Sequence, residues 1–377
     1  MKFTQKVTWI ELFYDLIVAA SMLLIFGSLA KHLSWGEFFW LSAVTLVVFS
    51  MWLSTTLIFN RYPSDSTGRR LFVIAQMIAL IYSVASIENS DRVDGDVGIV
   101  ALGVAMAVTA ATWAVVGRKS GELGTVDRLP VLSFAVGALF LLSAVFLPDS
   151  LNTVVFLIGA LIGFIPIFTM YVPRLLALKL IDLHHFVERL GGLVLIMLGE
   201  TFLEMAVLFT KGADPRAFGV VLVLILLTVV WWQYFTYVSG PPRSDSASVA
   251  IGYLLGHAAV ILGLGSAALS LTEVGLALTE QLSLPVLAGI LGGSMALVYV
   301  GMAVIAATTA APKGQTTILL LAAAVFAGLG WVLWTTWEMD EQILTGVIVL
   351  SSLGALLVSS LARMNTDKRC VSTLPSP

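Results

Sequence analysis

Long apolar runs separated by short polar strings make up most of the chain. About 20 apolar residues in a helix cross a bilayer, and within lipid only a helix or a closed barrel satisfies every backbone hydrogen bond. The runs are continuous and do not alternate in polarity, so they predict helices and not the strands of a barrel. Twelve spans are expected, at residues 10–30, 38–59, 71–87, 97–116, 129–147, 152–172, 187–209, 218–238, 250–271, 285–308, 317–336 and 342–362. The predicted fold class is therefore an all-α integral membrane protein.

The composition excludes several classes of protein. Of the 377 residues, 59% are hydrophobic and only 11% are charged, whereas a soluble domain carries about 25% charged residues. So few charges could not cover a surface that faces water, which excludes a soluble enzyme, a disordered chain and a nucleic-acid binder. The single cysteine, Cys370, excludes an intramolecular disulfide and a thiolate metal cluster. No metal and no cofactor is predicted.

The distribution of lysine and arginine predicts the orientation in the membrane. When the N-terminus is placed in the cytoplasm, the cytoplasmic segments hold all of the 20 basic residues except Lys31, Arg92, Lys211 and Arg216. Acidic residues gather in the external loops, for example at 91–96. Both termini are therefore expected to be cytoplasmic.

An internal repeat occurs at an offset of 180 residues. The string WLSTTLIFNRYPSDS at 52–66 aligns with WQYFTYVSGPPRSDS at 232–246, so that Trp52 meets Trp232 and the two Ser-Asp-Ser strings coincide. Six spans per repeat is an even number, which predicts two parallel halves in the same orientation. The expected halves are 1–180 and 181–362, followed by a cytoplasmic tail at 363–377.

Three strings carry a family resemblance: WIELFYDL in the first span, FNRYPSDSTGRR after the second, and HHFVERLGGLVLIMLGE at the start of the seventh. Together with WWQYF at the end of the eighth span, they resemble the bacterial low temperature requirement A (LtrA) family from Trp9 to about Leu271. The family name records a cold-growth phenotype, so the resemblance implies a multi-pass protein of the bacterial inner membrane and little chemistry. The motif residues that it carries over are Glu11, Asp15, Arg61, Asp65, His185, Glu188, Arg189 and Glu200.

A second resemblance concerns the loop after the second span. The string Asp65-Ser-Thr-Gly68-Arg69-Arg70 looks like the gate motif of major facilitator transporters, which also have two six-helix halves. That motif begins with a glycine four residues before the aspartate, where this chain has Arg61. The strings WIELFYDL and HFVERLGG have no counterpart in that superfamily, so this fold ranks second.

Ionisable residues inside the membrane are the functional candidates, since a charge at the bilayer centre costs at least about 2.5–3.5 kcal/mol. Glu200 lies about 18 Å along the seventh span from Glu188, near the midplane of a core about 30 Å thick. Glu204 is one turn further along on the same face. The two carboxylates are expected to bind and release a proton, with His257 of the ninth span completing a relay. The alternatives are a permanently protonated Glu200 and a neutral, hydrogen-bonded His257.

A second group of candidates lies at the cytoplasmic ends of the first and seventh spans. Glu11 and Asp15 are one turn apart, and Asp15 is deep enough to need a cationic partner, either Arg189 or Arg69. The alternative for Glu11 is compensation of the helix dipole.

The turn that opens the seventh span, at 184–189, is rich in histidine and charge, which predicts a salt-bridged gate or a proton entry; an interfacial anchor is the alternative. An arginine in this turn opposes a bound cation, so a metal site is not favoured. The predicted gate and its ion pairs consist of Glu11, Asp65, Arg61, Arg69, His185, Glu188 and Arg189. Gly192 and Gly199 are expected to permit close helix packing, with unwinding at Gly191 and Gly192 as the alternative.

Taken together, the candidates favour transport of a small solute coupled to protons. Two alternatives are left open: a membrane-embedded enzyme that uses carboxylates on a lipid or lipid-linked substrate, and a non-transporting membrane-stress factor. The expected partners are the lipid bilayer, protons and an unidentified small solute, with no nucleic acid. Assembly into a homo-oligomer is also left open.

Overall fold

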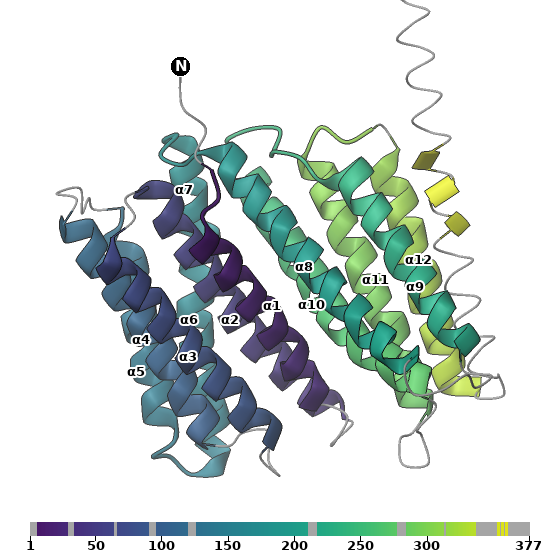
Figure 1. The fold of residues 1–377 in the computed structure, drawn as a ribbon, viewed down its shortest axis with the longest axis horizontal. Coiled ribbons are helices and arrows are strands. Elements are labelled where there is room, and N and C mark those ends of the chain that lie inside the picture. Colours follow the sequence, from purple (N-terminus) through teal and green to yellow (C-terminus); the bar gives the residue numbers. More distant parts are fainter. Residues whose placement is uncertain are drawn as a thin grey trace, which may run out of the picture. The chain divides into compact units, whose positions relative to one another are not determined.

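The structure, a computed structural model, describes residues 6–28, 34–63, 66–89, 96–119, 126–209, 217–276, 284–312 and 314–336, with 353–354, 356–357 and 359–360. Within these ranges the regular elements are helices, and Pro242 and Thr309 form an isolated bridge (Figure 1). Eight helices among the described residues are long and apolar enough to cross a membrane. The chain is therefore a multi-pass α-helical membrane protein, as the apolar runs predict.

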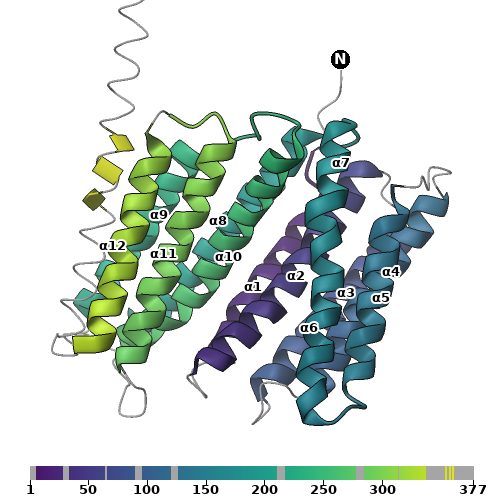
Figure 2. The ribbon, with the colours of Figure 1, turned by 180° about the vertical axis from the view of Figure 1, so that it is seen from behind.

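The chain divides into two compact units, and the boundary between them falls within two long helices, α8 and α10. Unit 1 consists of Met1–Ile196 and Ser244–Ile251. Its helices are α1 (Trp9–Gly27), α2 (Trp35–Arg61), α3 (Thr67–Asn89), α4 (Asp96–Lys119), α5 (Arg128–Ala144), α6 (Asp149–Pro166), the π-helix η2 (Ile167–Tyr171), α7 (Val172–Ala177) and the first part of α8 (Leu183–Phe209). From α3 to α6 each helix packs on the next, and α1 packs on α2 and α3. Figure 2 shows that α6 and α7 continue each other through the π-helical turn.

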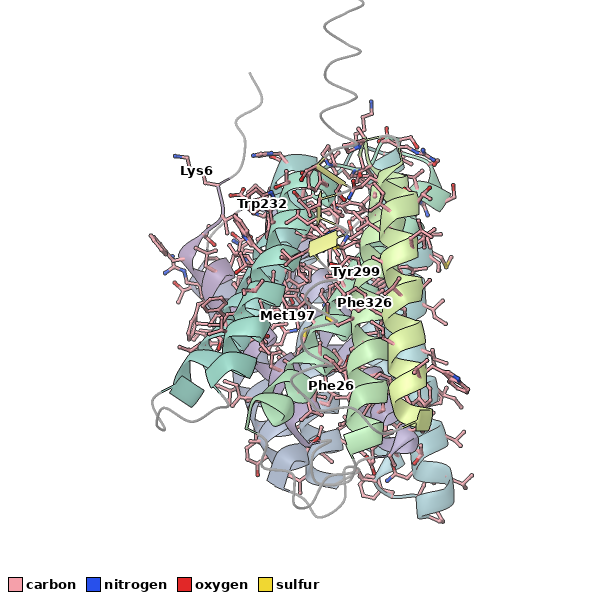
Figure 3. All side chains as sticks on the ribbon, turned by 90° about the vertical axis from the view of Figure 1, so that its right-hand side faces the viewer. Lys6, Phe26, Met197, Trp232, Tyr299 and Phe326 are labelled. Carbon is pink, nitrogen blue, oxygen red and sulfur yellow. The ribbon has the colours of Figure 1, made fainter. Side chains whose placement is uncertain are left out.

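Unit 2 consists of Met197–Arg243 and Gly252–Pro377. Its helices are the rest of α8, α9 (Ala217–Gln233), the π-helix η3 (Tyr234–Val238), most of α10 (Ala247–Leu276), α11 (Leu284–Thr308) and α12 (Gln315–Thr336). Helices α11 and α12 pack on each other, and the rings of Tyr299 and Phe326 lie 5.0 Å apart between centroids (Figure 3).

The first eleven predicted spans each overlap a helix, although the bounds differ by a few residues. Two further apolar helical stretches, Arg128–Ala144 and Val223–Val238, are shorter. The second is part of a longer helical segment, which begins with α9 at Ala217. The predicted span at 342–362 lies almost wholly outside the described residues, as do 1–5 and 361–377. The count of twelve spans and the side on which the termini lie stay predictions.

Positions that align in the sequence repeat differ in burial. Trp52 in unit 1 is fully buried. In unit 2, 49% of Trp232, which is labelled in Figure 3, is exposed. The two tryptophans therefore have different surroundings, and the repeat stays a prediction from the sequence.

Close contact between α10 and α11 depends on glycine. A Cβ atom added at Gly301 would lie 2.6 Å from the carbonyl oxygen of Gly256 and 2.8 Å from the backbone nitrogen of Val260. Both distances are below van der Waals contact, so glycine lets the two backbones approach each other. The glycines expected to pack closely, Gly192 and Gly199 on α8, have open space in the Cβ direction among the described residues. That expectation is wrong for α8, and α8 also runs through both positions without unwinding.

We expect Gly301→Ala to destabilise the protein by about 1–3 kcal/mol, because the backbone atoms that the new methyl group meets cannot move aside. Gly199→Ala is the matched control, since both changes make the same gain of about 0.5–1 kcal/mol from replacing a helical glycine, but the space at Gly199 is open. Thermal unfolding of the two purified variants in detergent measures the difference. Equal unfolding temperatures would show that the α10–α11 contact can relax.

Candidate functional site

The N-terminal half of α1 has one polar face and one apolar face. Glu11 and Asp15 lie one turn apart and are 0% and 1% exposed. The apolar residues between them, Leu12 and Phe13, are 42% and 52% exposed. In a membrane-spanning helix the exposed apolar face suits lipid, so the two carboxylates are directed into the interior of unit 1.

Arg189 of α8 bridges the two carboxylates. Its Nη1 donates to Glu11 Oε1 at 2.6 Å, and its Nη2 donates to Asp15 Oδ1 at 2.5 Å. The arginine is 1% exposed, so all three charged groups are buried. The planar guanidinium can serve two carboxylates at once because its donors point in fixed, divergent directions. We call Glu11, Asp15, Arg189 and the adjoining His185 the buried charge cluster.

The Glu11 carboxylate has further neighbours besides Arg189. Glu11 Oε2 accepts from the backbone N–H of Thr8 at 2.8 Å and from the Thr8 hydroxyl at 2.7 Å, which also caps the start of α1. Nε2 of His185 lies 3.1 Å from Glu11 Oε1. Three hydrogen bonds, two from Thr8 and one from Arg189, therefore reach this one carboxylate, and the His185 ring lies beside it.

Asp15 has fewer partners than Glu11. Its Oδ1 accepts from the indole N–H of Trp52 at 2.6 Å in addition to Arg189. Its Oδ2 is buried and has no hydrogen-bond partner among the described residues. Most buried polar atoms in proteins are paired, so an unpaired carboxylate oxygen beside an arginine marks a site of functional interest.

The segment that opens α8 is held by Asn60 of α2. The Asn60 Oδ1 accepts from the backbone N–H of Asp182 at 2.7 Å, and its Nδ2 donates to the Asp182 carbonyl oxygen at 2.8 Å. The same Nδ2 lies 3.2 Å from Nδ1 of His185. The Asp182 carboxylate accepts from the backbone N–H groups of His184 and His185, which caps the helix.

The formal charges in the buried cluster do not cancel. Glu11 and Asp15 contribute two negative charges when ionised, and Arg189 contributes one positive charge. An uncompensated charge buried away from water is costly, and proteins relieve it by pairing or by taking up a proton. The cluster is therefore suited to exchange one proton.

The predicted gate residues separate in the structure. Glu11, His185 and Arg189 come together with Asp15, and of the two arginines considered as its partner, Arg189 forms an ion pair with Asp15. Glu188 is exposed and does not join them. The position of Asp65 lies outside the described residues.

Glu200 and Glu204 lie further along α8, outside the buried charge cluster. Glu200 is partly exposed, and among the described residues no hydrogen bond or ion pair reaches its carboxylate. The side chain of Glu204 lies outside the described part of the chain. Their expected role as a proton site therefore stays a prediction.

His257 is buried in unit 2 and uses both of its ring nitrogens. Its Nδ1 lies 2.8 Å from the carbonyl oxygen of Tyr253, and its Nε2 lies 3.0 Å from the hydroxyl of Tyr234. A carbonyl oxygen only accepts, so Nδ1 carries the proton and Nε2 accepts from Tyr234. This geometry favours the neutral, hydrogen-bonded histidine over a relay with Glu200.

Arg61 belongs to a second buried site in unit 1, centred on Asp127. Nη2 of Arg61 donates to Asp127 Oδ2 at 2.8 Å, and the hydroxyls of Tyr62 and Tyr171 donate to the same carboxylate at 3.1 Å and 2.8 Å. Burial, and after it the charge of Asp127, raises the pKa of Tyr62, so this phenol keeps its proton and acts as a donor. The site joins the end of α2, the start of α5 and the π-helix η2.

Arg69 has different partners from those the gate hypothesis expects. Its Nη1 donates to the backbone carbonyl of Tyr62, and its guanidinium lies 4.5 Å from the ring centroid of Phe59. Cation–π contact of this kind stabilises a partly desolvated arginine. Arg69 therefore supports the end of α2.

We expect Tyr171→Phe to lower the free energy of unfolding by about 1.5–3 kcal/mol, because the buried Asp127 carboxylate loses one donor. Tyr82→Phe is the control, since 60% of Tyr82 is exposed. Chemical unfolding in detergent, followed by tryptophan fluorescence, gives the two values. An equal loss in both variants would contradict a specific role for the Tyr171 hydroxyl.

Several site residues were not singled out from the sequence as site residues. In the sequence Trp52 is marked only by its place in the repeat, and Asn60 lies inside the FNRYPSDSTGRR string but is not among the candidate site residues. Asp127 and Asp182 each precede a helix, where an aspartate is typical of a simple cap. In the sequence these residues are marked only by their position within or beside a motif string, and such a position does not show which side chain points inward.

The fold and this site define a class: a multi-pass helical membrane protein with a buried, charge-unbalanced cluster formed by its first helix and α8. The model of the family described as Bacterial low temperature requirement A protein (LtrA) matches residues 6–352, and the chain belongs to this family. The match confirms the resemblance and extends it beyond residue 271 to residue 352. Among curated proteins, none matches the sequence.

Proposed function

We propose that this LtrA-family protein moves a small solute across the membrane in exchange for, or together with, protons, and that Asp15 is the group that takes the proton. The observation that carries the proposal is the buried Oδ2 atom of Asp15, which has no hydrogen-bond partner among the described residues. It belongs to a cluster in which two carboxylates share one arginine. A site that lacks one positive charge and has a carboxylate oxygen without a hydrogen-bond partner can bind and release a proton.

The hydrogen bonds favour Asp15 over Glu11 as the proton acceptor. A proton on either oxygen of Glu11 would displace one of the donors from Thr8 or Arg189. A proton on Oδ2 of Asp15 displaces no donor, and it leaves the bonds from Trp52 and Arg189 to Oδ1 intact. Protonation of Asp15 therefore removes the excess charge at the smaller cost in hydrogen bonds.

The surroundings favour a proton over a metal cation as the coupling ion. The guanidinium of Arg189 lies 2.5 Å from Asp15 and repels any further cation. Among the described residues no group of three histidine, cysteine or acidic side chains could hold a metal ion.

The predicted topology supplies the direction of access. With the N-terminus in the cytoplasm, the cluster lies near the cytoplasmic end of α1, where a proton could enter from the cytoplasm. In this proposal Glu200 and Glu204 form a second proton site deeper in the membrane, and the inner-membrane location and the 6+6 repeat are further parts of the proposal. In the same proposal the Asp127 site holds α2, α5 and η2 together while the buried charge cluster on α1 and α8 takes up and releases the proton.

The test is transport by purified full-length protein in liposomes that contain a pH-sensitive dye. A panel of amino acids, sugars, polyamines and monovalent cations is added outside under an imposed pH gradient. We expect at least one class of solute to change the luminal pH faster than in protein-free liposomes. Failure of every class would reject the transport proposal; a chemically altered lipid in the same liposomes would instead support the enzyme alternative.

A further inference from the structure

The side-chain amide of Asn60 can adopt only one orientation. Its Oδ1 faces the backbone N–H of Asp182 at 2.7 Å, and its Nδ2 faces the carbonyl oxygen of the same residue at 2.8 Å. Turning the amide over would place two donors together and two acceptors together. The two bonds to one peptide segment therefore determine which end of the amide meets His185.

The oriented amide determines the protonation of His185. The Nδ2 of Asn60 lies 3.2 Å from His185 Nδ1, and both residues are buried. Since Nδ2 is a donor, Nδ1 must accept and cannot carry a proton. The proton of the neutral ring then lies on Nε2, which is 3.1 Å from Glu11 Oε1.

We propose that Asn60 is a positioning residue that holds His185 as the neutral Nε2–H tautomer, so that the buried charge cluster keeps its single excess negative charge. The charged groups that face His185 are Glu11 on α1 and Arg189 one turn along α8, and the Asp182 carboxylate caps the helix beside it. A doubly protonated His185 would bring the cluster to neutrality without a proton on Asp15. Asn60 prevents this, because a proton on Nδ1 would meet the amide hydrogen of Nδ2.

This inference rests on the proposed function for its consequence but not for its geometry. If Asp15 takes up the proton, a neutral His185 keeps the cluster at one excess negative charge, so only a proton on Asp15 makes the cluster neutral. If the protein does not transport protons, the tautomer of His185 is still determined by Asn60. The two statements can therefore fail separately.

The second buried histidine provides an internal control. His257 is bonded in the opposite sense, with its proton on Nδ1 toward the Tyr253 carbonyl and its Nε2 accepting from Tyr234. One chain thus holds two neutral buried histidines in opposite tautomers. Their ring nitrogens should give opposite patterns in a single measurement.

The test is nitrogen NMR of the full-length protein, labelled with ¹⁵N-histidine, in detergent micelles at neutral pH. The signals of His185 and His257 are assigned by their loss in His185→Gln and His257→Gln. We expect the neutral Nε2–H pattern for His185 and the neutral Nδ1–H pattern for His257. A charged His185, or one with its proton on Nδ1, would overturn the inference in the unaltered protein.

Asn60→Asp tests the cause. The new carboxylate oxygen in place of Nδ2 accepts a proton from Nδ1, so His185 is expected to shift to the doubly protonated form while His257 keeps its pattern. Asn60→Ala, which removes the donor without adding an acceptor, is expected to give a mixture of tautomers. An unchanged His185 pattern in both folded variants would reject Asn60 as the cause of the tautomer. If neither variant folds, the tautomer of His185 in the unaltered protein still supports or overturns the inference.

Discussion

Asp15→Asn is expected to abolish proton-coupled transport while the protein stays folded. Asparagine keeps an oxygen that accepts from Trp52 and Arg189, so the bonds at Oδ1 survive. It cannot take up a proton, and the remaining pair of Glu11 and Arg189 is electrically neutral. The cluster then has neither an excess charge nor a group that takes up the proton, so proton-coupled flux should fall to the level of protein-free liposomes.

The same variant can be tested without knowing the solute. Infrared difference spectra of the purified protein between acidic and alkaline pH should contain a carboxylic-acid band that Asp15→Asn removes. Glu188→Gln is the matched control, because Glu188 is an exposed carboxylate on α8 and should leave both the band and the flux unchanged. A band and a flux that persist in Asp15→Asn would contradict Asp15 as the proton acceptor.

Glu200→Gln separates the two proposed proton sites. Loss of coupling in Asp15→Asn alone assigns the proton to the buried cluster, and loss in Glu200→Gln alone assigns it to the deeper site that the sequence predicts. Loss of coupling in both variants would show that the proton passes both carboxylates on one route. Full coupling in both variants would reject both assignments.

Arg189→Leu is expected to cause the largest loss of stability, about 3–5 kcal/mol, because it leaves Glu11 and Asp15 buried without a counter-charge. Losing that much of a marginal total should prevent folding at neutral pH. The measurement is the yield of monodisperse protein in detergent together with its thermal unfolding temperature. Arg174→Leu serves as the control, since Arg174 is an exposed arginine of the same unit.

A rescue experiment separates the charge of Arg189 from its shape. Combining Arg189→Leu with Glu11→Gln and Asp15→Asn removes all three charges, so folding should return while proton coupling stays absent. If the triple variant is no more stable than Arg189→Leu, the stability contributed by Arg189 comes from packing and not from its charge.

Helix spacing predicted part of the buried charge cluster. The four-residue interval between Glu11 and Asp15 places both carboxylates on one face, and the depth of Asp15 predicts a cationic partner. Spacing could not choose between Arg189 and Arg69, since both are expected near the same side of the membrane. In the structure Arg69 donates to the carbonyl of Tyr62, and Arg189 forms the ion pair with Asp15.

Glu188 and Arg189 show why a motif string does not identify its own inward residues. Neighbouring positions in a helix point about 100° apart, so burial of one side chain does not require burial of the next. Packing of unit 1 buries Arg189 and exposes Glu188. The sequence contains the same charges for either arrangement, and only the contacts across helices distinguish them.

The sequence by itself determined that the chain is an α-helical membrane protein of the LtrA family, because hydropathy and motif strings are properties of contiguous residues. It also placed the candidate charges near helix ends and within spans. The tertiary structure alone decided that Trp52 and Asn60 join those charges and that the Oδ2 atom of Asp15 has no partner among the described residues. The physical reason is that hydrogen-bond partners from separate helices meet only when the helices pack, and local spacing contains no information about that meeting.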